Sequence, residues 1–189
     1  MKKIEILITS IAIGLLLTGC NLSQKSEYNI GDSITLGDYE FNIYKVKEKE
    51  LELISKKSIA TSKYYDDFSK AKNYYNEKSL IDDIVNDFTK KIKNQGYKIE
   101  DSGIISKEDL YELGKCEHSQ NVSGRPYICN EIPDFIDEES DFWLSGTFKI
   151  SSYYYYYKDG KIDAVSYEEE HGIRPTITIK ISELKNINN

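Results

Sequence analysis

The chain is poor in residues that build catalytic sites and membrane spans: its 189 residues include two histidines, one tryptophan, one methionine and three cysteines. With histidine only at positions 118 and 171, no convincing Ser-His-Asp arrangement can be assembled, so hydrolase chemistry has little support. No apolar run reaches the roughly 20 residues that a membrane-spanning helix needs. Basic residues are also fewer than acidic residues, 25 against 32, which gives a formal net charge of −7. This balance argues against a nucleic-acid partner, because few phosphate counterions would be released on binding.

The composition is nevertheless that of a folded protein. Apolar residues make up 39% of the chain, and 16 tyrosines add ring surface that can be buried with the hydroxyl at the rim. That is enough for a hydrophobic core, so disorder is not expected. The length suits one domain, which we place over residues 29–185.

The amino terminus has the pattern of an export signal. A basic start precedes an apolar run over residues 6–17, and this length of about twelve suits a secretory signal peptide. The run ends in Leu17-Thr18-Gly19-Cys20, which resembles the lipobox of bacterial lipoproteins. The resemblance implies that residues 1–19 are removed and that Cys20 carries the acyl chains, palmitate included. Residues 20–28 would then tether the domain to the outer face of the cell membrane. The alternative is an ordinary signal peptide with a chance cysteine.

Periodicity predicts an amino-terminal hairpin followed by two helices. Alternating apolar residues indicate strands over 34–36, 39–43 and 51–55. Ser79 and Asp82 form a capping-box pattern, and the apolar residues that follow lie on one helical stripe up to Gly96. A second, shorter helix is expected from residue 106 to Gly114. Between hairpin and helix, residues 64–75 are expected to be loop or short helix.

The carboxy-terminal half is predicted to be mostly strands. Residues 115–140 show no period and are expected to be an irregular loop. Strands are expected over 142–144, 147–150, 153–158, 161–165 and 176–181, with Asp159-Gly160 as a hairpin turn. The element order is that of an α+β fold.

Cys116 and Cys129 remain as a pair once Cys20 is assigned to lipid, and a disulfide is the default in an oxidising exterior. The alternative is a metal site that adds His118 and His171, although no CxxC or HxxxH spacing supports it.

Short motifs recur in a recognisable order along the chain. They are Tyr28-Asn29-Ile30-Gly31-Asp32, Leu53-Ile54-Ser55-Lys56-Lys57, Phe142-Trp143-Leu144-Ser145 and Gly172-Ile173-Arg174-Pro175. This succession resembles a bacterial domain of exported proteins that reads iGD…LiSk…yWLrS…GvRP. That domain is similar, in its Trp-Leu and Gly-x-Arg-Pro signatures, to the C-type-lectin-like fold of formylglycine-generating-enzyme relatives.

The resemblance implies a C-type-lectin-like α+β domain with antiparallel sheets, two helices and a long irregular loop. By analogy of fold, the expected role is a non-enzymatic module that binds or adheres to an extracellular protein or glycan, without a cofactor. One alternative is an oxidase in which Cys116 and Cys129 hold copper. Another is a structural envelope lipoprotein with no ligand.

The last of these motifs, Gly172-Ile173-Arg174-Pro175, is called the closing motif, and three of its residues have an expected role. Gly172 permits close backbone approach, and Pro175 fixes the backbone beside Arg174. We expect Arg174 to contact a buried carboxylate or carbonyls and to hold the last strand to the Trp143 segment; ligand binding is the alternative. Trp143 is expected in the core, with a sugar platform as the alternative.

Ligand contacts are expected from tyrosines and carboxylates. Along the strand over 153–158, Tyr154 and Tyr156 point to one side and the other tyrosines to the opposite side, and either set can be exposed. Asp137, Glu138 and Asp141 lie in the loop that faces ligand in lectin-like folds. Calcium could use such oxygens, but a solvated acidic loop is favoured, so no metal is expected.

Overall fold

The structure, a computed structural model, describes residues 28–72, 78–119, 126–136, 140–147 and 153–187. The signal peptide expected over 1–19, Cys20 and residues 21–27 of the tether lie outside the described residues. Within the described part, no helix is both long and apolar enough to cross a membrane.

Strands outnumber helices. In chain order the elements are β1 (Ser33–Leu36), β2 (Tyr39–Val46), β3 (Glu50–Ser55), β4 (Ala60–Ser62), α1 (Phe68–Lys72), α2 (Leu80–Asn94), β5 (Ile99–Ile104), α3 (Lys107–Leu113), β6 (Cys116–His118), β7 (Tyr127–Cys129), β8 (Asp141–Thr147), β9 (Tyr153–Lys158), β10 (Lys161–Ser166), β11 (His171–Ile173), β12 (Pro175–Lys180) and α4 (Ile181–Ile187).

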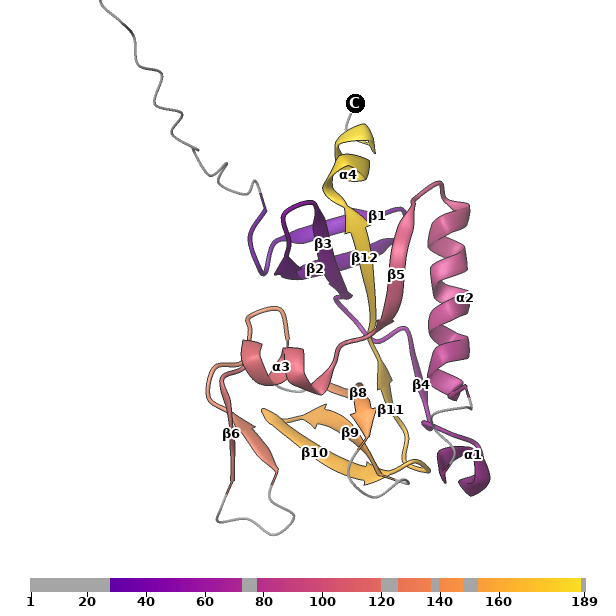
Figure 1. The fold of residues 1–189 in the computed structure, drawn as a ribbon, viewed down its shortest axis with the longest axis vertical. Helices are drawn as coiled ribbons and strands as arrows, with labels where there is room; N and C mark the ends of the chain where they lie inside the picture. The colour runs from indigo at the N-terminus through magenta and orange to yellow at the C-terminus, as the bar shows by residue number, and fades with distance from the viewer. Residues whose placement is uncertain (1–27, 73–77, 120–125, 137–139, 148–152, 188–189) are drawn as a thin grey trace, which may run out of the picture.

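Two sheets divide the described chain (Figure 1). The five-stranded sheet has the order β1-β2-β3-β12-β5, and the seven-stranded sheet has the order β4-β11-β8-β9-β10-β7-β6. The α+β class is therefore confirmed. The sheets are not antiparallel throughout, because β11 runs parallel to β8 at Gly172 and Phe142. The described part also contains four helices where two were expected.

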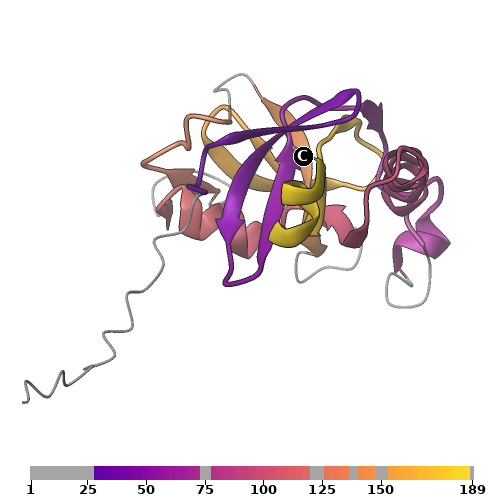
Figure 2. The ribbon, with the colours of Figure 1, turned by 90° about the horizontal axis from the view of Figure 1, so that it is seen from above.

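The first hairpin and α2 form at the turn and the capping box that the sequence predicts. Gly37 takes a φ of 59° in the turn between β1 and β2, and β2 then pairs with β3. Both halves of the predicted capping box are present, since the Ser79 hydroxyl accepts from the Asp82 amide and the Asp82 carboxylate accepts from the Ser79 amide. The stripe on α2 buries Phe88 and Ile92 in a core shared with the first hairpin and β12. Figure 2 shows α2 end-on beside the sheets.

The tyrosine-rich strand lies inside the seven-stranded sheet. Asp159 and Gly160, with φ of 49° and 73°, form the predicted turn between β9 and β10. Residues on one side of β9 pack with α3, and residues on the other side pack with Trp143 and Tyr65. Other parts of the fold therefore pack against both faces of β9, so neither face is left wholly to solvent.

Several segments differ from expectation. The short strands β4 and β11 were not predicted, and β8 runs without a break over Asp141–Thr147 where a strand over 142–144 was expected; residues 148–150 of the next expected strand lie outside the described residues. The segment over 115–140 contains the paired strands β6 and β7, whose residues are too few to show a period. The last strand ends at Lys180, and α4 begins at Ile181, which was expected to be a strand residue. Strand β5 was not predicted; its polar residues Glu100 to Ser102 break the apolar alternation, and pairing with β12 forms it.

Candidate ligand-binding groove

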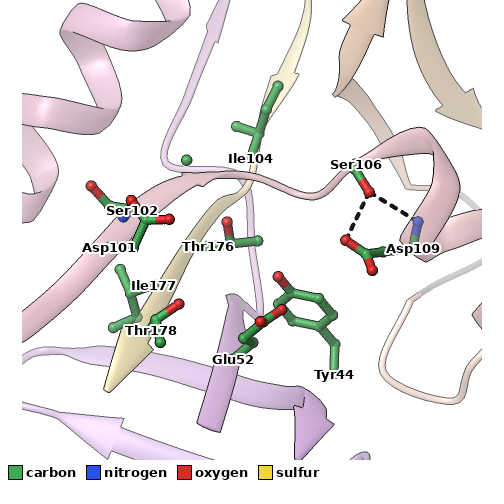
Figure 3. Close-up of a pocket in the computed structure, with 11 residues that line it drawn as sticks. Tyr44, Glu52, Asp101, Ser102, Ile104, Ser106, Asp109, Thr176, Ile177 and Thr178 are labelled. Carbon is green, nitrogen blue, oxygen red and sulfur yellow. Dashed lines mark hydrogen bonds between the residues drawn. The ribbon is translucent and has the colours of Figure 1, made fainter. Parts of the chain in front are cut away.

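A polar hollow of about 230 Å³ lies beside the paired strands β5 and β12 of the five-stranded sheet, next to the start of α3 (Figure 3). It is lined by Tyr44, Glu52, Asp101, Ser102, Gly103, Ile104, Ser106, Asp109, Thr176, Ile177 and Thr178. These residues come from β2, β3, β5 and β12 of the five-stranded sheet and from α3, so the hollow exists only after that sheet has formed and α3 has packed beside it. Hydroxyl and carboxylate groups dominate the lining.

Tyr44 forms one wall of the hollow and is 6% exposed. Burial raises the pKa of its hydroxyl well above the ordinary value, and the negative charges of Glu52 and Asp109 raise it further. The hydroxyl therefore remains protonated, and it can donate to the Glu52 carboxylate. A neutral donor thus faces a negatively charged group inside the hollow.

Asp109 lies at the other end, on the first turn of α3. Its Oδ1 accepts from Lys45 Nζ at 2.8 Å, and its Oδ2 accepts from the Ser106 hydroxyl at 2.7 Å. Burial alone would raise the pKa of Asp109, but the two hydrogen bonds together with the positive charges of Lys45 and Lys47 outweigh it and leave the pKa below its ordinary value. The carboxylate is therefore ionised throughout the physiological range.

A second hollow of about 220 Å³ adjoins the first and shares Tyr44 and Asp109 with it. Its remaining lining is Ile30, Lys45, Glu112 and Leu113. The first hollow is mainly polar, whereas Ile30 and Leu113 give the second an apolar part. Each is smaller than the roughly 300 Å³ of a typical small-molecule site, but together they reach that range. We call the pair the inter-sheet groove, because α3, which joins β5 of the five-stranded sheet to β6 of the seven-stranded sheet, forms one wall of it.

A larger hollow of about 650 Å³ runs along α2 and reaches Ser102 of β5. No apolar side chain lines it; its residues are Lys78, Asp83, Asn86, Asp87, Thr89, Lys90, Lys93 and Ser102. Ligand sites usually combine apolar walls with a few polar groups. The inter-sheet groove fits that description better.

The Asp109 contacts predict a pH-dependent stability. A carboxyl whose pKa is lower in the folded than in the unfolded chain stabilises the fold above the unfolded value of about 3.9, and this contribution is lost as pH falls through the folded pKa. Asp109→Asn should therefore lower the free energy of unfolding by about 1 kcal/mol at pH 7 and by less at about pH 3. Urea unfolding at both pH values measures this. A loss that is the same at both would contradict it, and Asp87→Asn, which removes an exposed ion pair with Lys90, is the control.

The predicted cysteine pair is in place. Cys116 and Cys129 face each other across β6 and β7 with their sulfur atoms 2.04 Å apart, so the pair is capable of forming a disulfide. The residues of the alternative metal site lie elsewhere: the His118 ring contacts Tyr127, and the His171 ring contacts Trp143. Among the described residues, no group of three or more His, Cys, Asp and Glu could hold a metal ion.

The residues predicted to contact a ligand differ in their exposure. Tyr154 is 1% exposed, stacks on Tyr64 and donates its hydroxyl to the Ala71 carbonyl, so as a ligand contact it is a wrong prediction. Packing of α1 and the chain before it over this face of β9 is the cause. Tyr156 is half-buried and stacks on His171. Asp137 and Glu138 lie outside the described residues.

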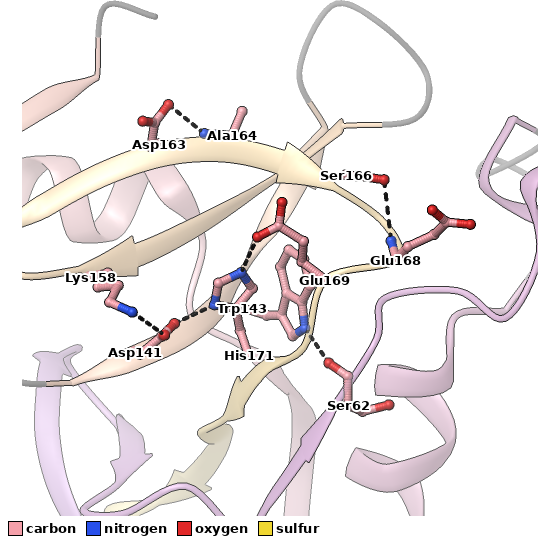
Figure 4. Close-up of polar contacts among 10 residues, drawn as sticks. All are labelled: Ser62, Asp141, Trp143, Lys158, Asp163, Ala164, Ser166, Glu168, Glu169 and His171. Atoms are coloured by element: carbon pink, nitrogen blue, oxygen red, sulfur yellow. Dashed lines mark hydrogen bonds and ion pairs between the residues drawn. The ribbon is translucent and has the colours of Figure 1, made fainter. Parts of the chain in front are cut away.

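Asp141 is half-buried in a polar cluster rather than presented on a loop (Figure 4). Its carboxylate accepts from the His171 Nδ1 and contacts Lys158 Nζ at 3.2 Å. His171 Nε2 lies 3.9 Å from the Glu169 carboxylate. These contacts join β8, β9 and β11, which is a structural task.

The closing motif is placed as expected. Arg174 is 2% exposed; its Nε donates to the Ser55 carbonyl at 2.9 Å, its Nη2 donates to the Phe135 carbonyl at 3.2 Å, and the guanidinium lies over the Phe142 ring. It thus contacts carbonyls, and it holds the start of β12 to the strand that carries Trp143.

Trp143 and Gly172 also match their expected tasks. Trp143 is 0% exposed, and its Nε1 donates to the Ser62 carbonyl, which places it in the core. A Cβ on Gly172 would lie 2.5 Å from the Asp141 carbonyl oxygen, so the backbones do approach closely there. Pro175 follows as the first residue of β12.

The groove residues were missed by sequence reasoning. Ser106 and Asp109 were recognised only as the start of a helix, and Tyr44 and Glu52 only as residues near the first hairpin. Nothing local marks them as neighbours, because β5 and β12 bring them together. The available signal was a set of polar residues, such as Thr176 and Thr178, on an otherwise apolar last strand.

No protein-family model matches the chain, and no curated protein and no solved structure matches it.

Proposed function

We propose that this chain is a lipid-anchored protein of the bacterial cell surface that binds a ligand in the inter-sheet groove without catalysing a reaction. The lipobox-like motif at Cys20 supports the location, and a C-type-lectin-like domain is the finer fold that we propose within the α+β class. The observation that carries the binding role is the groove itself. It combines a polar hollow and a partly apolar hollow around Tyr44 and Asp109.

The cysteine pair favours binding over the oxidase alternative. Copper ligation would need two free thiolates beside a substrate cleft. Cys116 and Cys129 are 2% and 9% exposed and lie within bonding distance of each other. Neither is among the described residues that line the inter-sheet groove.

A variant that fills the groove tests the proposal. Gly103 lines the polar hollow, and a Cβ there would meet nothing closer than the Thr176 hydroxyl, at 3.9 Å. The Cβ of Gly103→Val therefore has room, and its two methyl groups add bulk at the lining of the hollow. Thermal-shift screening of the full chain in detergent, with N-acetyl dipeptide amides and small saccharides as probes, should find compounds that raise Tm. Gly103→Val should abolish the shift. Thr35→Val on the exposed strand β1 is the matched control and should retain it.

Two results would contradict the proposal. If no probe raises Tm, the structural-lipoprotein alternative is favoured. If Gly103→Val retains the shift, the ligand binds somewhere else. The anchor is tested separately: Cys20→Ala should no longer incorporate labelled palmitate or fractionate with membranes, and unchanged fractionation would contradict lipid anchoring.

A further inference from the structure

Negative charge exceeds positive charge around the inter-sheet groove. Its lining carries four carboxylates, Glu52, Asp101, Asp109 and Glu112. Against these stand Lys45, which lines the partly apolar hollow, and Lys47, which pairs with Glu52. A site with this balance favours a cationic group over a neutral or anionic one.

The effect of these charges is concentrated at the boundary between the two hollows. Glu52 and Asp109 both act on the Tyr44 hydroxyl, and Tyr44 and Asp109 line both hollows. A cation placed here would lie beside two carboxylates and an oriented hydroxyl group. Partial burial keeps the intervening dielectric low and strengthens that attraction.

The chain already places a cation of its own at this boundary. Lys45 Nζ binds Asp109 at 2.8 Å, and its side chain is 45% exposed. An ion pair exposed to this degree contributes little, about 0–1 kcal/mol, so an incoming cation can displace the ammonium at small cost. The Lys45 contact thus marks the position that a ligand cation would take.

The partly apolar hollow defines the neighbouring group of the ligand. Ile30 is 55% exposed on one side, and Leu113 forms the other side. The two hollows have nearly equal volumes, about 230 and 220 Å³, and each is too small for a typical whole ligand. Two adjacent hollows of this size suit two adjacent side chains of one peptide better than one compact molecule.

We propose, on the basis of the binding function above, that the groove binds a peptide segment in which arginine or lysine adjoins an aliphatic residue. The basic group binds Asp109 and Glu52 in place of the Lys45 ammonium, and the aliphatic side chain contacts Ile30 and Leu113. Arginine is the preferred cation, because its planar guanidinium can donate to two carboxylates at once.

The test compares two isosteric probes, N-acetyl-leucyl-arginine amide and N-acetyl-leucyl-citrulline amide, by calorimetric titration of the full chain in detergent. The arginine peptide should bind at least about tenfold more tightly, because citrulline keeps the size and shape of the side chain but loses its charge and replaces one NH₂ donor by a carbonyl oxygen. Asp109→Asn should remove most of this preference. Lys45→Met should increase affinity for the arginine peptide severalfold, because it removes the competing ammonium.

Affinity for the arginine peptide should fall in Asp109→Asn and rise in Lys45→Met. If losing the Lys45–Asp109 ion pair only damaged the fold, affinity would fall in both variants, so the two results together distinguish ligand recognition from a structural effect. Equal affinity for arginine and citrulline peptides, or weaker binding by Lys45→Met, overturns the inference. If both bind equally and Gly103→Val abolishes both, the proposed function stands and only the ligand class is wrong. If hexylamine binds as tightly as the arginine peptide, the ligand is a simple amine, and the peptide assignment is overturned.

Discussion

Replacing Cys116 and Cys129 together by serine should lower the free energy of unfolding by about 3 kcal/mol. The two positions are 13 residues apart, and a cross-link that closes a loop of about this size removes that much chain entropy from the unfolded state. Both positions are also buried against the core beside α3, where serine hydroxyls would be poorly solvated. Urea unfolding of the oxidised parent and the double variant measures the difference.

Reduction of the parent protein provides the control for the disulfide prediction. Unfolding of the parent in excess reductant should approach that of the double serine variant, while the variant should not respond to reductant. Mass spectrometry of the oxidised parent should show no free thiol at Cys116 or Cys129. Equal urea midpoints for parent and variant would contradict a stabilising disulfide.

Replacing Arg174 by methionine should lower the free energy of unfolding by roughly 2–4 kcal/mol. Methionine fills similar space but donates nothing to the carbonyls of Ser55 and Phe135, and hydrogen bonds from charged groups are worth about 1.5–3 kcal/mol each. The contact with the Phe142 ring also loses its charge. Chemical denaturation gives the value directly.

Two further variants delimit the Arg174 effect. Arg174→Lys keeps the charge but lacks the planar fork, so it should restore only part of the stability. Lys90→Met on the exposed side of α2 makes a similar change at a site with one exposed ion pair, and should cost less than about 0.5 kcal/mol. If Arg174→Met costs as little as Lys90→Met, the guanidinium does not hold the two sheets together.

Local signals identified the elements whose formation depends on nearby residues. The capping box at Ser79 and the apolar stripe behind it predicted α2, and Asp159-Gly160 predicted the β9–β10 turn. The same kind of signal gave no warning of β5, whose polar residues resemble a loop until β12 pairs with them. It also gave no warning of the parallel contact between β11 and β8, because the two strands are distant in sequence.

The burial of the tyrosines on β9 likewise depends partly on the local pattern and partly on tertiary packing. Alternation along β9 correctly separates Tyr154 and Tyr156 from Tyr155 and Tyr157, but alternation alone cannot say whether a face is covered. Residues around Tyr64 and Ala71 pack over Tyr154, so a tyrosine expected at the surface lies in the core. That outcome depends on a segment whose own sequence shows no period.

By itself, the sequence determined the α+β class, the main helix and the turn between β9 and β10, because each rests on short-range backbone geometry. For the two cysteines, Trp143 and Arg174 it gave a preferred interpretation and left an alternative open. Only the tertiary structure decided which side chains meet. Tyr44 and Asp109 share a groove because β5 pairs with β12 in the five-stranded sheet and so brings α3, which follows β5, to β2. The free energy that fixes such pairings is spread over the whole core rather than stored in any one segment.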